Sequence, residues 1–161
     1  MLDLKALLSK ILDALKVDYI IEEGTSGIWT YRKWASGIAE CWCITTPTSI
    51  PASTWATWGS VYEAKITDVI NYPTNLFTSF PTLIASATPR STAGVMGIET
   101  SATGNASHTP YFYALRPNKP TTTMTISASI HAIGTWGGVI ESIKRFFTSL
   151  SSPKDWGWAM C

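Results

Sequence analysis

Two histidines and eleven acidic residues are the groups in this 161-residue sequence that could carry acid–base or metal chemistry. His108 falls in an expected loop, and His131 falls on the polar face of an expected strand. Neither histidine stands in a metal-ligand spacing or beside an obvious nucleophile. We therefore expect no catalytic role and no metal site at either histidine, and the sequence indicates no cofactor.

The acidic residues could support glycoside hydrolysis only if two of them faced each other across a cleft. Glu40 could meet Glu63 or Glu99 in this way through tertiary folding, but no spacing in the sequence indicates it. A phosphate-binding glycine loop is also missing, since Gly137 and Gly138 precede an expected helix. The sequence favours a protein that is not an enzyme, with a polysaccharide-degrading enzyme as the alternative.

The three cysteines, Cys41, Cys43 and Cys161, are odd in number and lack metal-ligand spacing. Cys41 and Cys43 flank Trp42 in an expected strand, so their side chains share one face, and a disulfide between them would be strained. We therefore expect buried free thiols in a reducing compartment.

Eight tryptophans are many for this length, and an indole ring can stack on a sugar ring. For any single tryptophan, packing in a core or interface is the more common use. Trp55 and Trp58 lie in residues 45–67, a loop-like stretch rich in Thr, Ser and Pro. They are the best candidates for a glycan contact, which keeps a bacterial carbohydrate-binding module as an alternative.

Composition excludes two classes of partner. The net charge is +1, only 14% of residues are charged, and Lys and Arg do not cluster, so the basic surface of a nucleic-acid-binding protein is not expected. Apolar stretches stay well short of the ~20 residues that cross a bilayer, so membrane insertion is not expected. Asp3 and Asp13 interrupt any secretory signal. One hydrophobic core is the expectation for this length.

The N-terminal residues 1–18 are expected to form a helix that serves as a stalk or anchor. Its apolar residues alternate in steps of four and three, which places them in one seam along about four turns. An isolated helix of this length is marginal, so the seam should pack against partner helices or against its own domain. The seam residues are Leu4, Leu8, Ile11 and Leu15.

Residues 24–136 are expected to form a β-sandwich-like head. Residues 24–44 read as two antiparallel strands joined by a turn at residues 35–37. Trp29, Tyr31 and Lys33 should share one face of the first strand, and Ala39, Cys41 and Cys43 one face of the second. Large aromatic rings stand on both faces, so we expect both faces to be covered.

Further strands follow from apolar runs and alternation. Residues 83–87 read as a buried strand, residues 95–99 and 111–115 as two more, and residues 103–110 as an exposed loop between them. The clearest strand alternates apolar and polar residues, which predicts one core face and one polar face. Its core positions are Met124, Ile126, Ala128, Ile130 and Ala132.

Residues 137–161 are expected to form an amphipathic helix that ends in an aromatic tail. Its apolar stripe contains Val139, Ile140, Ile143, Phe146, Phe147 and Leu150. The predicted fold is therefore mainly β: an antiparallel β-sandwich-like head with a short N-terminal helix, a possible coiled-coil stalk, and a C-terminal amphipathic helix.

The hairpin carries a pattern that resembles the opening hairpin of phage structural proteins found as tail-fibre or baseplate head domains. The family's Gly-x-Trp-x-Tyr-x-Lys strand, glycine turn, Ala-Glu-x-Trp return strand and closing Ile-x-Ala-Ile-Gly-x-Trp strand each have a counterpart. Two departures are Cys43, where the family often has glycine, and the continuation of the chain beyond the closing tryptophan. The matched residues are Gly27, Trp29, Tyr31, Lys33, Gly37, Ala39, Glu40, Trp42, Ile130, Ala132, Ile133, Gly134 and Trp136, with Tyr72, Pro73, Phe80 and Pro81 between them.

The resemblance implies a phage virion structural protein of tail-fibre or receptor-binding type, made in the host cytoplasm and located on the tail, baseplate or capsid surface. It implies a homo-oligomer, with a trimer favoured, contacts with other phage structural proteins, and attachment to a bacterial surface glycan. The alternative within this class is a capsid or baseplate decoration protein without a receptor role. The matched positions suggest framework residues, so the resemblance transfers no ligand-binding residue.

Overall fold

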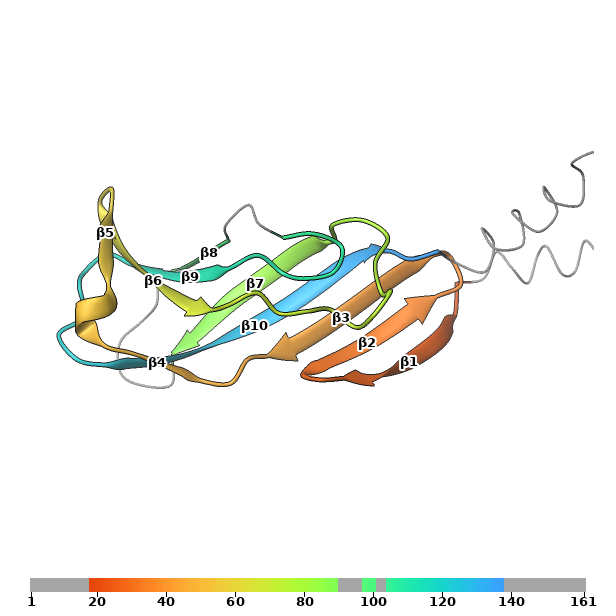
Figure 1. Ribbon diagram of the computed structural model, residues 1–161, viewed down its shortest axis with the longest axis horizontal. Helices are drawn as coiled ribbons and strands as arrows, with labels where there is room; N and C mark the ends of the chain where they lie inside the picture. Colours follow the sequence, from red (N-terminus) through yellow and green to blue (C-terminus); the bar gives the residue numbers. More distant parts are fainter. Residues whose placement is uncertain (1–17, 90–96, 101–103, 138–161) are drawn as a thin grey trace, which may run out of the picture.

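The computed structural model describes residues 18–89, 97–100 and 104–137. These residues form two β-sheets in which every strand pairing is antiparallel (Figure 1). The expectation of a mainly β, antiparallel fold is confirmed. The predicted helices at residues 1–18 and 137–161, together with the seam residues Leu4, Leu8, Ile11 and Leu15, lie outside the described residues except at residues 18 and 137.

The larger sheet contains six strands built around the long strand β10, Met124–Thr135. One edge of β10 pairs with β3 and then with β4, and its other edge pairs with β7. β3 continues through β2 to β1, which forms the far edge of the sheet. The remaining strands are β1 (Ile20–Ser26), β2 (Trp29–Trp34), β3 (Ile38–Ile44), β4 (Thr48–Ile50) and β7 (Thr82–Pro89).

The smaller sheet has four strands in the order β5, β6, β9 and β8. A short 3₁₀ helix, Ala52–Thr54, leads from β4 into this sheet. The strands are β5 (Ala56–Trp58), β6 (Val61–Thr67), β8 (Gly97–Thr100) and β9 (Phe112–Arg116). The predicted strands near residues 95–99 and 111–115 correspond to β8 and β9, and Val95 lies outside the described residues.

The core lies between the two sheets, toward which strands such as β3, β6 and β10 turn alternate residues. The five core positions predicted on β10 are all buried, with exposed fractions of 2% or less. The smaller sheet contributes Ala64, Ile66, Phe112 and Ala114 to the same cluster. The pattern along β10 therefore predicted its core face correctly, although Ser127 on the opposite face is also fully buried.

The predicted hairpin is formed by β2 and β3, with the turn where it was expected. Gly37 has φ of 89°, a left-handed conformation that favours glycine, and its N–H donates to the carbonyl of Trp34 at 3.0 Å. Ala39, Cys41 and Cys43 share one face, as the alternation indicated, and they are buried with Trp29 on the inner side of the sheet. The sequence did not predict β1 as a separate strand before this hairpin.

The loop between β6 and β7 closes the inner face beneath β2 and β3. Trp29 packs against Tyr72 with ring centroids 5.4 Å apart, and Tyr72 packs against Phe77 at 5.0 Å. The indole N–H of Trp29 donates to the carbonyl of Asn71 at 2.8 Å. The motif residue Trp29 is therefore part of the framework.

Two expectations about burial are wrong. Only one face of strand β7 points toward the core, and Ile84 on the other face is 61% exposed. In the predicted exposed loop, Thr109 and Pro110 are buried and His108 forms a β-bridge with Asn71. Thr103 of that loop lies outside the described residues.

In the described part of the chain, no helix is long and apolar enough to cross a membrane.

Candidate functional site

The candidate site is the outer face of the six-stranded sheet, which we define as the side turned away from the core. Because Ala39, Cys41 and Cys43 point inward, Glu40 and Trp42 on the same strand point outward. A hollow of about 770 Å³ opens on this face over β2, β3, β10 and β7. No described residue covers it, so the cover expected for this face of the hairpin is not found within the described part of the chain.

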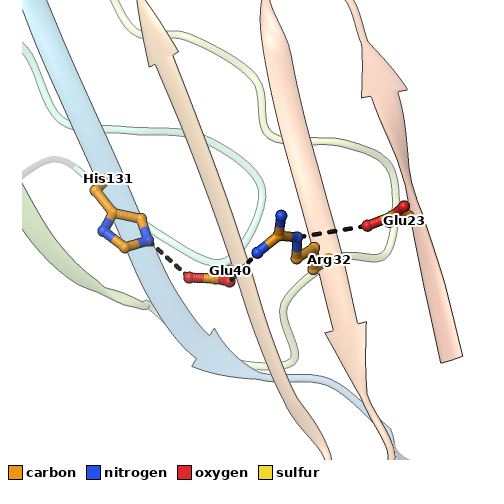
Figure 2. A network of polar contacts seen from close by, with 4 residues as sticks. All are labelled: Glu23, Arg32, Glu40 and His131. Atoms are coloured by element: carbon orange, nitrogen blue, oxygen red, sulfur yellow. Dashed lines mark hydrogen bonds and ion pairs between the residues drawn. The ribbon is translucent and has the colours of Figure 1, made fainter. Parts of the chain in front are cut away.

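Four polar side chains form a row across four strands of the outer face (Figure 2). Glu23 Oε2 lies 3.5 Å from Arg32 Nε, and Arg32 Nη1 lies 3.9 Å from Glu40 Oε1. His131 Nε2 lies 3.0 Å from Glu40 Oε2. The Glu40 side chain is 19% exposed, whereas the Arg32 side chain is 40% exposed. The row therefore places a partly desolvated carboxylate between two groups that can bind it.

Trp42 is held in place by two members of this row. The guanidinium of Arg32 lies over its ring, 5.1 Å from the centroid, as in a cation–π interaction. The His131 ring meets Trp42 edge-on, with centroids 6.2 Å apart and an angle of 89° between the rings. The guanidinium takes up ring face that a stacked sugar would need, so Trp42 is a poor platform for a glycan.

Aliphatic side chains surround this polar centre. Ile28 and Ile44 lie toward one end of the strands, Ile38 toward the other, and Ile84 and Ile133 lie on β7 and β10. Their exposed fractions run from 38% for Ile133 to 61% for Ile44 and Ile84. Large exposed apolar patches on soluble proteins mark interaction sites, protein–protein contacts among them.

The described residues do not assemble a recognisable catalytic or metal site. No group of three or more His, Cys, Asp or Glu side chains among them could hold a metal ion. Glu40 lies on the outer face of the six-stranded sheet, whereas Glu63 and Glu99 lie on the opposite outer face, that of the four-stranded sheet. Glu40 therefore does not face either carboxylate across a cleft.

Trp55 and Trp58, the two predicted glycan contacts, have different surroundings. Trp55 is 2% exposed and belongs to the core, so it has no free ring face to offer a ligand. The prediction that Trp55 contacts a glycan is therefore wrong. The loop-like sequence around Trp55 did not indicate that this residue is buried. Trp58 is 51% exposed beside the turn of the β5–β6 hairpin and stays available.

His108 has a structural role in its loop. Its Nε2 lies 2.8 Å from Asn105 Nδ2, and its Nδ1 lies 2.9 Å from the carbonyl oxygen of Thr109. These contacts fit one neutral tautomer, in which Nδ1–H donates to the carbonyl and Nε2 accepts from the amide. Both ring nitrogens of His108 are therefore used to close the loop.

Cys41 and Cys43 are buried free thiols, as expected from the sequence. Burial raises the pKa of the Cys43 thiol to about 12, and it raises the pKa of Cys41 as well, with smaller effects from Cys43 and Glu40. These thiols are therefore protonated and unreactive near neutral pH. Cys161 lies outside the described residues.

The other motif residues of β2 form a clamp on β1. Tyr31 Oη donates to Glu22 Oε1 at 2.8 Å, and Lys33 Nζ donates to Glu22 Oε2 at 2.9 Å. The two hydrogen bonds lower the pKa of Glu22, that from Lys33 most, and the carboxylate raises the pKa of Tyr31. Tyr31 and Lys33 thus hold the edge strand in place.

The outer face was not predicted as a site from the sequence. The sequence does contain a pattern that indicates an apolar outer face, because isoleucines alternate with the core positions of β2, β3 and β7. These isoleucines are Ile28, Ile38, Ile44 and Ile84. Only the strand order shows that these residues gather around Arg32.

Comparison with known protein families, with characterised proteins and with solved structures found no match.

Proposed function

We propose that this chain is a non-enzymatic structural protein of a phage particle, of tail-fibre or receptor-binding type, that works by assembling with copies of itself. The observation that carries the proposal is the outer face of the six-stranded sheet, where five exposed isoleucines surround a row of ion pairs. The resemblance of the β2–β3 hairpin and the closing strand to phage head domains supplies the particle context.

The exposed apolar area of the outer face favours association. Removing apolar surface from water contributes about 25 cal/mol per Å², so a sheet face with five exposed isoleucines gains by being covered. Charged residues at the centre of such a face do not oppose association if each finds an opposite charge across the contact. A structural role in an assembly explains both features together.

In this proposal the N-terminal segment and the head act together. The seam of Leu4, Leu8, Ile11 and Leu15 joins helices of neighbouring chains into a stalk, with three chains favoured, and the head adds contacts through its outer face. The assembly is located on the virion, where other phage structural proteins are its further partners.

Light scattering on the full chain tests the proposal, because one protomer is 17.6 kDa. We expect an assembly of several protomers. The double variant Ile44→Lys/Ile84→Lys should lower that mass, since it places charges on the apolar patch. Lys65→Glu, on the other sheet, is the matched control and should leave the mass unchanged. A wild-type chain that runs as a monomer at all concentrations contradicts the proposal.

A second candidate function, attachment to a host glycan, is favoured by Trp58. Its ring is 51% exposed on the β5–β6 hairpin, which projects at one end of the sheets (Figure 1). We expect a glycan array probed with the full chain to give signals that Trp58→Ala removes and Thr57→Ala keeps. Signals that survive Trp58→Ala would exclude this residue as the contact.

A further inference from the structure

The row of charges on the outer face has an order that matters for how two copies can meet. From β1 to β3 it reads Glu23, Arg32, Glu40, with alternating negative, positive and negative charge. The strand register places Arg32 directly opposite Glu40, and Thr30 directly opposite Trp42. Beyond this pair, Ile28 in the turn before β2 and Ile44 at the end of β3 line the same hollow. The outer faces of β2 and β3 therefore carry matched pairs, level by level.

We propose that, within the assembly proposed above, the outer face packs against the same face of a second copy about a two-fold axis that runs along the strands between β2 and β3. Such an axis exchanges β2 with β3 across the contact and keeps each residue at its own level along the strands. Arg32 of each copy then meets Glu40 of the other, and Ile28 of each copy meets Ile44 of the other.

This arrangement satisfies the requirements of a two-fold interface. A two-fold contact uses the same patch on both copies, so the patch must complement itself. Each Arg32 gains a second carboxylate, and each Glu40 gains a second guanidinium, so neither charge is buried without a partner. At the next level Thr30 of each copy meets Trp42 of the other, and beyond it isoleucines meet isoleucines. Because the axis runs along the strands, the two sheets pack with strands nearly aligned, which is a common geometry for sheets packed face to face.

Other occupants of the face fit these features less well. A glycan gains little from five isoleucines, and Arg32 already lies over the ring of Trp42. A peptide or an unrelated protein would need its own alternating charges, spaced to match a row that this chain already carries. The charges of the row complement those of the same row on a second copy, so a second copy is the partner that fits this face best.

Complementary charge reversal tests the proposed contact. In Arg32→Glu, residues 23, 32 and 40 are all acidic, so two such copies repel each other; in Glu40→Arg, residues 32 and 40 are both basic. We expect each variant alone to have a lower mass than the wild-type assembly by light scattering, because the contact between outer faces is lost. An equimolar mixture should recover the wild-type mass, because both contacts then pair opposite charges.

A second test does not depend on charge and covers the case in which a reversal variant fails to fold. Ile28→Cys and Ile44→Cys are made separately in a Cys161→Ser background and mixed under mild oxidation. We expect a disulfide-linked dimer in the mixture, because residue 28 of one copy meets residue 44 of the other. Each variant alone should form little dimer, because its new cysteine does not meet itself.

The outcomes separate this inference from the proposed function. If Ile44→Lys/Ile84→Lys lowers the mass but the charge-reversed mixture does not recover and no 28–44 link forms, the outer face assembles by another geometry and the two-fold contact is overturned. If the wild-type chain is a monomer throughout, the proposed self-assembly and the two-fold contact both fail. Recovery in the mixture together with the 28–44 link establishes the contact.

Discussion

At the scale of single residues, the structure depends on side chains that complete the backbone pairing. Thr45 lies where the chain passes from β3 to β4, both of which pair with the same edge of β10. The N–H of Thr45 donates to the carbonyl of Ala128 at 2.8 Å, and the N–H of Ala128 donates to Thr45 Oγ1 at 2.9 Å. A side-chain oxygen thus replaces a backbone carbonyl in the ladder.

Thr45→Val should therefore destabilise the fold although it hardly changes the size of the side chain. The buried N–H of Ala128 loses its acceptor, which costs about 1–3 kcal/mol. The exposed neighbour Thr46, substituted in the same way, is the matched control and should change the free energy of unfolding little. Urea denaturation of both variants measures the difference, and equal stabilities would contradict this role for Thr45.

The thiols of the inner face give a second prediction at this scale. Alkylation requires the thiolate, and burial holds the pKa of Cys43 near 12 and raises that of Cys41. In a Cys161→Ser background at pH 8, iodoacetamide should leave the folded chain unmodified and should add two labels after denaturation. Mass spectrometry counts the labels, and labelling of the folded chain would contradict burial of these residues.

At the scale of elements, the edge strand β1 is held by the clamp of Tyr31, Lys33 and Glu22. Because the pKa of Glu22 is lower in the folded chain than its usual 4.5, the clamp stabilises the fold fully above that pH. This contribution is lost as the pH falls from about 4.5 through the lowered pKa. The Glu22 side chain is 45% exposed, so the contribution is small, about 0.2–1 kcal/mol.

Glu22→Gln should accordingly lower the free energy of unfolding at pH 7 and have a smaller effect in acid. Denaturation of the wild type and the variant between pH 7 and pH 3 measures the difference at each pH. A difference that does not change over this range would mean that the carboxylate charge does not stabilise the clamp.

The close packing of β10 against the β6–β7 loop is a second feature of this scale. A Cβ atom added at Gly134 would lie 2.8 Å from the ring of Phe77 and 3.0 Å from Pro81 Cβ, so the loop would have to move. Gly134→Ala should cost about 1–3 kcal/mol. Gly97, a strand glycine with no atom within 4 Å of an added Cβ, is the matched control. Thermal unfolding should show a loss for Gly134→Ala alone.

At the scale of the whole molecule, local patterns predicted the strands but not their partners. The alternation in β10 and the glycine turn after β2 are encoded within a few residues, so the sequence indicated both elements and the inner face of β10. The pairing of β3 and β4 with one edge of β10 depends on contacts between residues far apart in the sequence, such as Thr45 with Ala128. Trp55 was misjudged for the same reason, because only the packing of the two sheets buries it.

The outer face illustrates the same limit. Nothing in the local sequence around Arg32, Glu40 or His131 indicates a site. Their row forms only because β2, β3 and β10 are neighbours in the sheet. The expected absence of an enzyme site and the phage assignment remain proposals, since both depend on what this face binds. In the proposed assembly, the outer face is buried between chains.

Chemical modification of the two histidines measures this burial most directly. His131 lies on the outer face, and His108 lies in the loop beyond β8, so the second histidine is an internal control. We predict that diethyl pyrocarbonate modifies His131 more slowly in the wild-type assembly than in Ile44→Lys/Ile84→Lys, whereas His108 reacts at the same rate in both. Equal rates at His131 in the two proteins would contradict burial of the outer face.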